Sequence, residues 1–592
     1  MTTTTEKLAA LQSAMKSQNI HAWVIPSSDP HESEYAADHW NGRAWLSGFN
    51  GSAGTVVVLQ EQAALWTDGR YFLQAEEQLA GTGIELMKEG QPGVPPINKW
   101  LAENLNEGEV VGFDGKVMSL NSTRNLLKTF ARKNLSLKTD VDLLNDVWKD
   151  RPAMPTEPVF LHSDAMAGKT REEKLAEVRV EMTEAGADHA LVTALDDIAW
   201  LFNLRGSDVE CNPVFLAYAL VSDDSVQLFV DDSRIEEEAL KALKASSVEL
   251  KAYSEIAETL SSMDNAALLI DPATTCRWLF DAIPDSVNVV EGACPAKNLK
   301  AIKNPIEIDR MKDCHRRDGV AIVRFMRWLE KQIPTGTLTE VTLDENLQAF
   351  RAQAPEFKGP SFPSIAGYAP NGAVIHYRAE EETCLTVQPK GLLLVDSGGQ
   401  YPDGTTDITR TFACGEMTDE ERKDYTLVLK CHINLARARF LRGTRGIQLD
   451  MLARQPAWAE GQNYNHGTGH GVGYFLNVHE GPHSVSPKWL DEPLKPGMLI
   501  TNEPGMYRNG KHGIRIENIM LVEEDRKTEF GEFYKLRDLT LAPIDTRPLI
   551  EDMLNIEEVE WLNNYHSKVR SELSPLLDGE DLDWLVKATE AI

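Results

Sequence analysis

Cysteine, positive charge and long apolar runs are all scarce in this chain. Its seven cysteines among 592 residues have an odd count, no close pairs and no C-x-x-C spacing, which excludes a disulfide scaffold and a cysteine zinc knuckle. The 60 basic residues are outnumbered by 91 acidic ones, and the net charge of −31 repels phosphate backbones and anionic lipid surfaces. We therefore expect no nucleic-acid partner and no membrane partner.

No stretch of the sequence approaches the ~20 consecutive apolar residues of a membrane span. Residues 1–18 also lack the apolar segment of a secretion signal, so we expect a cytoplasmic protein with reduced thiols. The composition, 42% hydrophobic and 26% charged, is that of a folded globular protein. A length of 592 residues exceeds the ~250–300 residues of a single core, which predicts two or three domains.

A helix-then-strand pattern occurs twice in the first half of the chain. Apolar residues fall at i, i+3 and i+7 of a helix in both copies, first at Leu8, Leu11 and Met15 and again at Leu175, Val178 and Met182. A short apolar run typical of a strand follows each helix. The repeat predicts two related α/β domains, residues 1–157 and 158–301, joined by the segment 151–158 with its three prolines.

A third region, residues 302–592, opens with a helix-start signal. Asn304 can cap the helix, Pro305 suits its first position and Glu307 completes a capping box, so a long helix should run to Glu330. Residues 544–592 have the pattern of short acidic amphipathic helices, with Trp561 and Trp584, and predict a helical tail.

Two pairs of acidic residues recur within this region. Asp396 and Asp407 follow one apolar strand, and Glu503 and Glu517 follow a second strand with similar neighbours. A single acid beside a strand is usually a solvated cap or a salt bridge, but the repetition suggests a pseudo-twofold axis where all four carboxylates meet. Buried like charges cost several kcal/mol each unless they are neutralised, and a pair of divalent cations is the simplest solution.

Between the two acid pairs lies the sequence HGTGHGVG, residues 466–473. His466 and His470 have the i, i+4 spacing of helical zinc-binding motifs, but four alternating glycines disfavour a helix and no Glu stands between them. The run predicts a loop or strand whose backbone closely approaches another segment. It is the natural source of a nitrogen ligand for the cations.

These residues and motifs resemble a known family. Asp396, Asp407, His470, Glu503 and Glu517 are similar, in their order and local motifs, to the metal ligands of the pita-bread metallopeptidases, which include methionine aminopeptidases, prolidases and aminopeptidase P. Over its whole length the chain resembles the long, three-domain form of aminopeptidase P. The resemblance implies an α/β (α+β) architecture, in which two creatinase-like N-terminal domains precede a pita-bread catalytic domain.

The resemblance also implies roles for particular residues. Asp396 would bind one metal and His470 and Glu503 chiefly the other, with Asp407 and Glu517 bridging them. The oxygen-rich donor set favours Mn²⁺. The implied cleft and substrate residues are His376, His466, His479, Glu503 and Arg515, where His376 and His479 would contact the substrate and Arg515 could instead be a salt-bridge partner.

The implied activity is hydrolysis of the bond between the first residue of a short peptide and a proline in second position. A prolidase-type dipeptidase shares the five ligands and stays open as an alternative, whereas a creatinase works without the metals. An inactive binding module of the same fold would have lost ligands. The resemblance further implies a homodimer, for which Trp458, in an expected turn before the His-Gly run, is a candidate contact.

Overall fold

The computed structural model describes residues 3–592 and divides into two compact units. The first contains the chain up to His162 together with Thr170–Leu299, and the second contains Ser163–Lys169 and Lys300–Ile592. Within residues 3–592, no helix combines the length and apolar character needed to cross a membrane.

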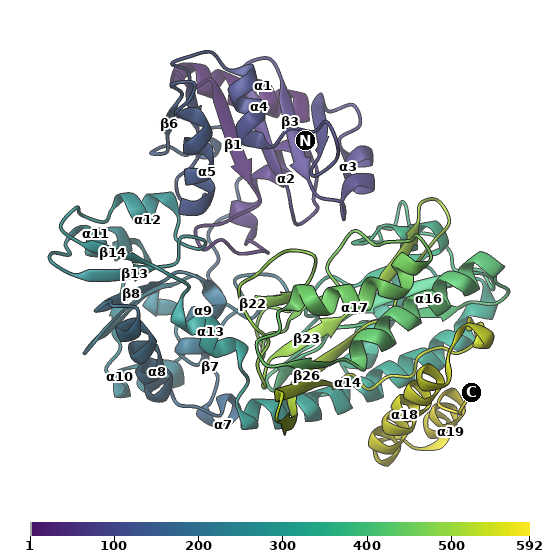
Figure 1. Cartoon of the computed structure of the whole chain (residues 1–592). Coiled ribbons are helices and arrows are strands. Elements are labelled where there is room, and N and C mark those ends of the chain that lie inside the picture. Colours follow the sequence, from purple (N-terminus) through teal and green to yellow (C-terminus); the bar gives the residue numbers. More distant parts are fainter. Residues whose placement is uncertain (1–2) are drawn as a thin grey trace. The chain divides into compact units, whose positions relative to one another are not determined.

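The first unit contains two six-stranded sheets with the same topology, which confirms the predicted repeat (Figure 1). The strand orders are β4-β3-β2-β1-β5-β6 and β12-β11-β10-β8-β13-β14. The first sheet is built from β1 (Ala22–Pro26), β2 (Thr55–Leu59), β3 (Ala63–Thr67), β4 (Ile84–Lys88), β5 (Val110–Gly112) and β6 (Ser136–Lys138). The second is built from β8 (His189–Val192), β10 (Tyr218–Ser222), β11 (Val226–Phe229), β12 (Glu249–Lys251), β13 (Ala267–Ile270) and β14 (Asn288–Glu291).

Helices flank both sheets in equivalent positions. They are α1 (Thr4–Ser17), α2 (Gly42–Ser47), α3 (Phe72–Gln78), α4 (Ile97–Asn104), α5 (Leu120–Phe130) and α6 (Leu143–Val147), then α8 (Arg171–Glu184), α9 (Leu195–Leu201), α10 (Glu237–Ala245), α11 (Ile256–Ser261) and α12 (Arg277–Asp281). Helix α8 shows why the sequence pattern predicted a helix. Thr170 and Glu173 form its capping box, and Leu175, Val178 and Met182 are buried as their spacing predicts.

The second unit repeats one order of elements. Its first half contains α14 (Pro305–Gln332), α15 (Glu340–Arg351), β15 (Ile365–Tyr368), β16 (Leu392–Ser397), the ribbon β17 (Gln400–Tyr401) and β18 (Gly404–Thr405), and β19 (Ile408–Ala413). Its second half contains α16 (Asp419–Ala436), β20 (Arg439–Leu441), α17 (Gly446–Ala459), β21 (Gly469–Gly471), β22 (Glu480–Val485), β23 (Leu499–Asn502), the ribbon β24 (Gly505–Arg508) and β25 (His512–Arg515), and β26 (Asn518–Thr528). In each half, two helices are followed by a strand, a two-stranded ribbon and a second strand.

Helix α14 begins as the sequence predicts. The Asn304 side chain accepts hydrogen bonds from the backbone amides of Ile306 and Glu307 at 2.9 and 3.0 Å, and Oε2 of Glu307 accepts one from the Asn304 amide at 2.9 Å. The helix then runs for 28 residues and buries Met311, Ala321 and other side chains against the sheets.

The two halves meet where β19 and β26 begin. The Glu517 amide donates to the Thr409 carbonyl at 3.0 Å, and the Thr409 hydroxyl donates to Oε2 of Glu517 at 2.7 Å. Farther along β19, the Thr411 hydroxyl donates to the Arg515 carbonyl at 2.9 Å. These bonds define the junction between the halves.

The expected turn around Trp458 is wrong, because these residues form the last turn of α17 with Pro456 inside the helix. Proline cannot donate to the Leu452 carbonyl four residues earlier, which normally opposes a helix. That carbonyl instead accepts a bond from Nδ2 of Asn434 on α16 at 2.9 Å. Trp458 is 49% exposed, so it lies outside the core.

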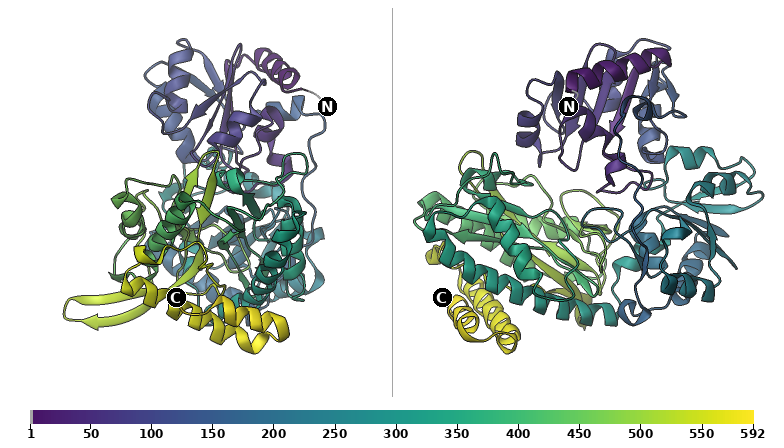
Figure 2. Two further views of the ribbon diagram at one scale, coloured as in Figure 1. Left: turned by 90° about the vertical axis from the view of Figure 1, so that its right-hand side faces the viewer. Right: turned by 180° about the vertical axis from the view of Figure 1, so that it is seen from behind.

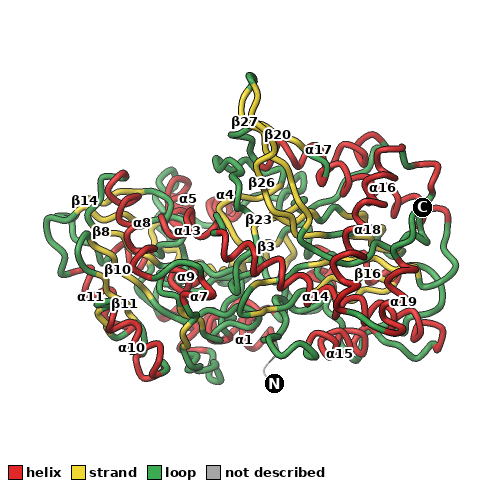
Figure 3. Tube along the Cα trace, turned by 90° about the horizontal axis from the view of Figure 1, so that it is seen from below, coloured by secondary structure: helices red, strands yellow, loops and turns green. Residues whose placement is uncertain are grey.

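The C-terminal segment is helical, as expected, and consists of α18 (Ile556–Leu573) and α19 (Gly579–Ala588). Both helices lie beside α14 (Figure 2). A hairpin of β26 and β27 (Gly531–Asp538) projects from the unit (Figure 3), and Phe530 at its tip is 78% exposed.

Candidate metal centre

The five candidate ligands lie beside the junction between the two halves. Asp396 is in β16 and Asp407 immediately precedes β19. His470 is the middle residue of β21, Glu503 follows β23, and Glu517 immediately precedes β26. Each half therefore contributes two carboxylates, and the second half adds the imidazole.

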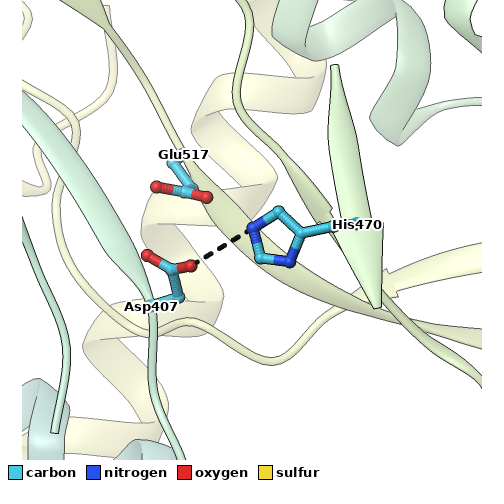
Figure 4. A group of neighbouring side chains, drawn as sticks. All are labelled: Asp407, His470 and Glu517. Carbon is cyan, nitrogen blue, oxygen red and sulfur yellow. Dashed lines mark ion pairs between the residues drawn. The ribbon is translucent and has the colours of Figure 1, made fainter. Parts of the chain in front are cut away.

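Three of these residues converge closely enough to share a cation (Figure 4). One ligand atom from each of Asp407, His470 and Glu517 lies within 4.8 Å of the other two. Nε2 of His470 is 3.5 Å from Oδ2 of Asp407 and 3.6 Å from Oε1 of Glu503. The structure thus brings Glu503 to the edge of the same group.

The orientation of His470 points Nε2 toward the carboxylates, where a metal would bind. Its Nδ1 is 2.8 Å from the Gly471 carbonyl oxygen, which can only accept a hydrogen bond. The neutral ring therefore carries its proton on Nδ1, and the lone pair of Nε2 faces the carboxylates.

The glycines around His470 allow this placement, as the sequence predicted. A Cβ atom on Gly469 would lie 1.9 Å from the Thr501 carbonyl oxygen, and one on Gly471 would lie 2.2 Å from that of Glu480. Because any side chain there would collide with a neighbouring strand, only glycine lets β21 lie so close to β22 and β23.

Asp396 joins the cluster through Arg515, which is 1% exposed. Nη2 of Arg515 donates to Oδ2 of Asp396 at 2.6 Å, and Nη1 donates to the Tyr507 hydroxyl at 2.7 Å. The other oxygen, Oδ1, is buried and has no hydrogen-bond partner among residues 3–592. A bound cation or an ordered water molecule would satisfy such an oxygen.

Burial dominates the electrostatics of the carboxylates. It raises the pKa of Asp407 and of Glu517 well above the usual range, and neighbouring carboxylates raise both further. Burial also raises the pKa of Glu503, although Arg515 opposes this effect. Three buried acids, the partly buried Glu503 and one imidazole, with Arg515 as the cation beside them, fit a pair of divalent cations.

The candidate cleft histidines occupy different positions around this cluster. His466 lies with Nδ1 4.0 Å from Oε2 of Glu503 and with Nε2 2.8 Å from the Tyr507 hydroxyl. The rings of His479 and His470 meet edge to face at 4.3 Å. His376 is partly buried in a turn, and the carbonyl of the preceding residue, Ile375, accepts a bond from Arg515 at 3.4 Å.

Comparison with known proteins identifies the family. Metallopeptidase family M24 matches residues 309–524 and the C-terminal region of this peptidase matches residues 532–592. The Creatinase/Prolidase N-terminal domain matches twice, at residues 7–145 and 150–307. Aminopeptidase P1 of Arabidopsis thaliana is 38% identical, over 99% of this chain and 99% of its own length. A probable Xaa-Pro aminopeptidase P of Laccaria bicolor is 42% identical, over 98% of this chain and 92% of its own length.

The chain belongs to the Xaa-Pro aminopeptidase P family.

Solved structures agree with this membership. The X-prolyl aminopeptidase of Caenorhabditis elegans, described as a cytosolic enzyme with a di-nuclear active site, superposes with a TM-score of 0.96 at 34% identity over 100% of both chains. The Xaa-Pro dipeptidase of Bacillus anthracis covers 64% of this chain and 99% of its own, with a TM-score of 0.52 and 24% identity, and shows the fold alone. The expected architecture of an aminopeptidase P, two creatinase-like domains and a pita-bread domain, is confirmed.

The sequence did not predict the residues that hold the candidate ligands and Arg515 in place. Tyr507 links His466 to Arg515 through its hydroxyl, and Thr409 bonds to both Glu517 and Arg515. A signal for Tyr507 existed, because it occupies the same place in the second half as Tyr401 does in the first. Thr409 carries no such signal.

Proposed function

We propose that this chain is a metal-dependent aminopeptidase that removes the first residue of short peptides whose second residue is proline. The observation that supports this most directly is the convergence of Asp407, His470 and Glu517, with Glu503 and Asp396 beside them, in a chain of the aminopeptidase P family. Asp396, Asp407, His470, Glu503 and Glu517 are the residues that would hold the ions. A pair of divalent ions supplies Lewis acidity and a water nucleophile at neutral pH.

The chain's own residues would handle the protons and the substrate. Glu503 is well suited to protonate the leaving proline nitrogen, because burial raises its pKa toward neutrality in the metal-free protein. Either His376 or His466 is proposed to donate to the carbonyl oxygen as it gains negative charge, and His466 would first have to exchange its bond to the Gly467 carbonyl, 2.7 Å from Nδ1. Arg515 would fix the orientation of Asp396, since their ion pair is buried and only 2.6 Å long.

Specificity for proline requires a pocket for its ring. The scissile bond is a tertiary amide without an N–H, so recognition must come from the shape of the ring. We assign that role to His376 and His479. The Tyr377 side chain, which donates to Glu340 at 2.9 Å, anchors the turn that carries His376.

One assay separates this proposal from its alternatives. Metal-free protein is incubated with the tripeptide Arg-Pro-Pro and the dipeptide Ala-Pro, and Mn²⁺ is then added. We expect metal-dependent release of arginine from the tripeptide and much slower cleavage of the dipeptide. Preference for Ala-Pro would indicate a prolidase, and no cleavage of either peptide would indicate a binding module.

The choice of metal follows from the donor chemistry. Four carboxylates and one imidazole form an oxygen-rich donor set, which suits Mn²⁺. Structural zinc is instead usually bound by thiolates and imidazoles. We propose a cytoplasmic location as well, because all seven cysteines are free thiols. Metal analysis of the protein purified from its own cells tests the first assignment.

We also propose a homodimer formed by the second unit. Helix α17 carries three exposed apolar residues, Met451 at 55%, Leu452 at 43% and Trp458 at 49%. Such a group is typical of a protein–protein contact. Sedimentation at micromolar protein should give twice the 66.0 kDa chain mass, and Trp458→Ser should shift the protein toward monomer. A wild-type monomer in that experiment would exclude the dimer.

A further inference from the structure

A small cavity lies directly behind Asp407, on the side of α14. Helix α14 supplies His315, Asp318 and Gly319 to its wall, the segment entering β19 supplies Thr406 and Asp407, and Thr540 closes it. Its volume is about 10 Å³, which is the size of a site for one water molecule. Helix α14 lies close to the Leu541 backbone beside this space, since a Cβ atom on Gly319 would lie 2.5 Å from the Leu541 carbonyl oxygen.

His315, in the wall of this cavity, has an unsatisfied acceptor. The side chain is 3% exposed, and its Nδ1 is 2.8 Å from the Met311 carbonyl oxygen. Because that oxygen can only accept, Nδ1 carries the proton and Nε2 presents a lone pair. Burial lowers the pKa of His315, which keeps the ring neutral. Nε2 is buried without a hydrogen-bond partner among residues 3–592.

Four other polar side chains line the cavity, those of Asp318, Thr406, Asp407 and Thr540. The Thr406 hydroxyl accepts from the Gly399 amide at 2.9 Å. Both carboxylate oxygens of Asp318 already accept bonds from Arg351. The Thr540 hydroxyl accepts from the Ile519 amide at 2.8 Å and keeps its own hydrogen to donate. Asp407 can only accept while it is ionised. A water molecule in this cavity has partners for three hydrogen bonds, because it can donate to His315 and Asp407 and accept from Thr540.

We propose that one water molecule occupies this cavity, donates to Nε2 of His315 and to the Asp407 carboxylate, and thereby makes His315 a positioning residue for the metal centre. The inference rests on the proposed role of Asp407 as a ligand. Three hydrogen bonds, with Thr540 as the donor to the water, are the usual number for a buried water. Holding a ligating carboxylate from behind fixes the direction in which it presents its oxygens to the ions.

Two substitutions at His315 separate this role from simple packing. His315→Asn keeps a donor at the position of Nδ1 and loses the acceptor at Nε2, whereas His315→Gln keeps an acceptor near the position of Nε2. Titration of the metal-free full chain with Mn²⁺ by calorimetry should show affinity weakened ~10–100-fold in the Asn variant and within ~3-fold of wild type in the Gln variant. Equal losses in both variants, or no loss in the Asn variant, would overturn the proposal.

The matched control is His566→Asn. This change also removes a buried Nε2 acceptor, which in the wild type accepts a hydrogen bond from the Ile544 amide. It should leave Mn²⁺ affinity unchanged. Should both His315 variants fail to fold, a crystal structure of the metal-loaded wild type still decides. It should show a water ~2.7–3.2 Å from Nε2 of His315 and from the Asp407 carboxylate, and an empty cavity would overturn the inference.

Asp407→Asn distinguishes a failure of this inference from a failure of the proposed function. If Asp407→Asn binds Mn²⁺ as tightly as wild type, the ligand assignment itself is wrong. If Asp407→Asn loses Mn²⁺ and the His315 variants do not, only the positioning role of His315 is wrong.

Discussion

Replacing Asp407 by asparagine should have opposite effects on the metal-free and metal-bound protein. The substitution keeps the shape of a side chain that is 4% exposed and removes its charge. Without metal, burial and the neighbouring Asp396 and Glu503 raise the pKa of Asp407 above its unfolded value of 3.8. The native state then binds the proton more tightly than the unfolded state, so the carboxyl group costs stability that grows as the pH rises above that value.

Asparagine cannot ionise and avoids this cost. Near neutral pH the metal-free Asp407→Asn protein should be more stable than metal-free wild type by on the order of 1–3 kcal/mol, the usual cost of an uncompensated buried polar group. With Mn²⁺ at 100 times the wild-type Kd, binding stabilises wild type by ~2.7 kcal/mol, whereas a variant that binds 100-fold more weakly gains only ~0.4 kcal/mol.

The assay is denaturant unfolding with and without Mn²⁺, followed by turnover of Arg-Pro-Pro. Asp403→Asn is a matched control, because Asp403 is also buried, at 7% exposure, but forms an ion pair with Arg317. It should destabilise the metal-free protein and leave the stabilisation by Mn²⁺ intact. The reasoning is refuted if Asp407→Asn keeps more than about a tenth of wild-type turnover, or if its metal-free form is the less stable one.

Three further outcomes are expected. His376→Ala should lower turnover while its metal content stays near that of wild type, and loss of metal would place His376 among the ligands instead. Replacing the proline of Arg-Pro-Pro by alanine should reduce kcat/KM ~100-fold, or ~2.7 kcal/mol, whereas equal rates would exclude a proline pocket. Burial lowers the pKa of His566 from 6.5 to about 4, so protonation of the unfolded chain should cost ~2 kcal/mol of stability at pH 5 relative to neutral pH. His566→Gln should remove that part of the pH dependence in urea unfolding, and an unchanged dependence would contradict the assignment.

Much of the fold was predictable because local rules and the global fold agree. The capping box of Asn304 and Glu307 forms as its spacing indicates, and the repeated helix-strand pattern gives two sheets of identical order. The candidate ligands were predictable because each lies in a short motif. The glycines beside His470 predicted a close backbone approach, and neighbouring strands do lie close to them.

The rest depends on contacts between residues far apart in the sequence. Asp396 and Arg515 are 119 positions apart, and only the docking of the two halves makes them partners. The helix through Pro456 was missed because the bond that permits it comes from Asn434 on another helix. Nothing in the sequence separates His315 from any other helical histidine, since its significance comes from the cavity beside it.

The nearly symmetric frame of the second unit surrounds an asymmetric set of ligands. Each half supplies two carboxylates, but the imidazole of His470 comes from one half only, and the Arg515 cation is paired with Asp396 at the other end. The Arg515 guanidinium contacts Asp396 directly and acts on Glu503 only at longer range, so it repels an ion beside Asp396 more strongly than an ion beside His470. The two ions should therefore differ in affinity and leave one after the other as a chelator is added, so that a half-loaded protein is a distinct species.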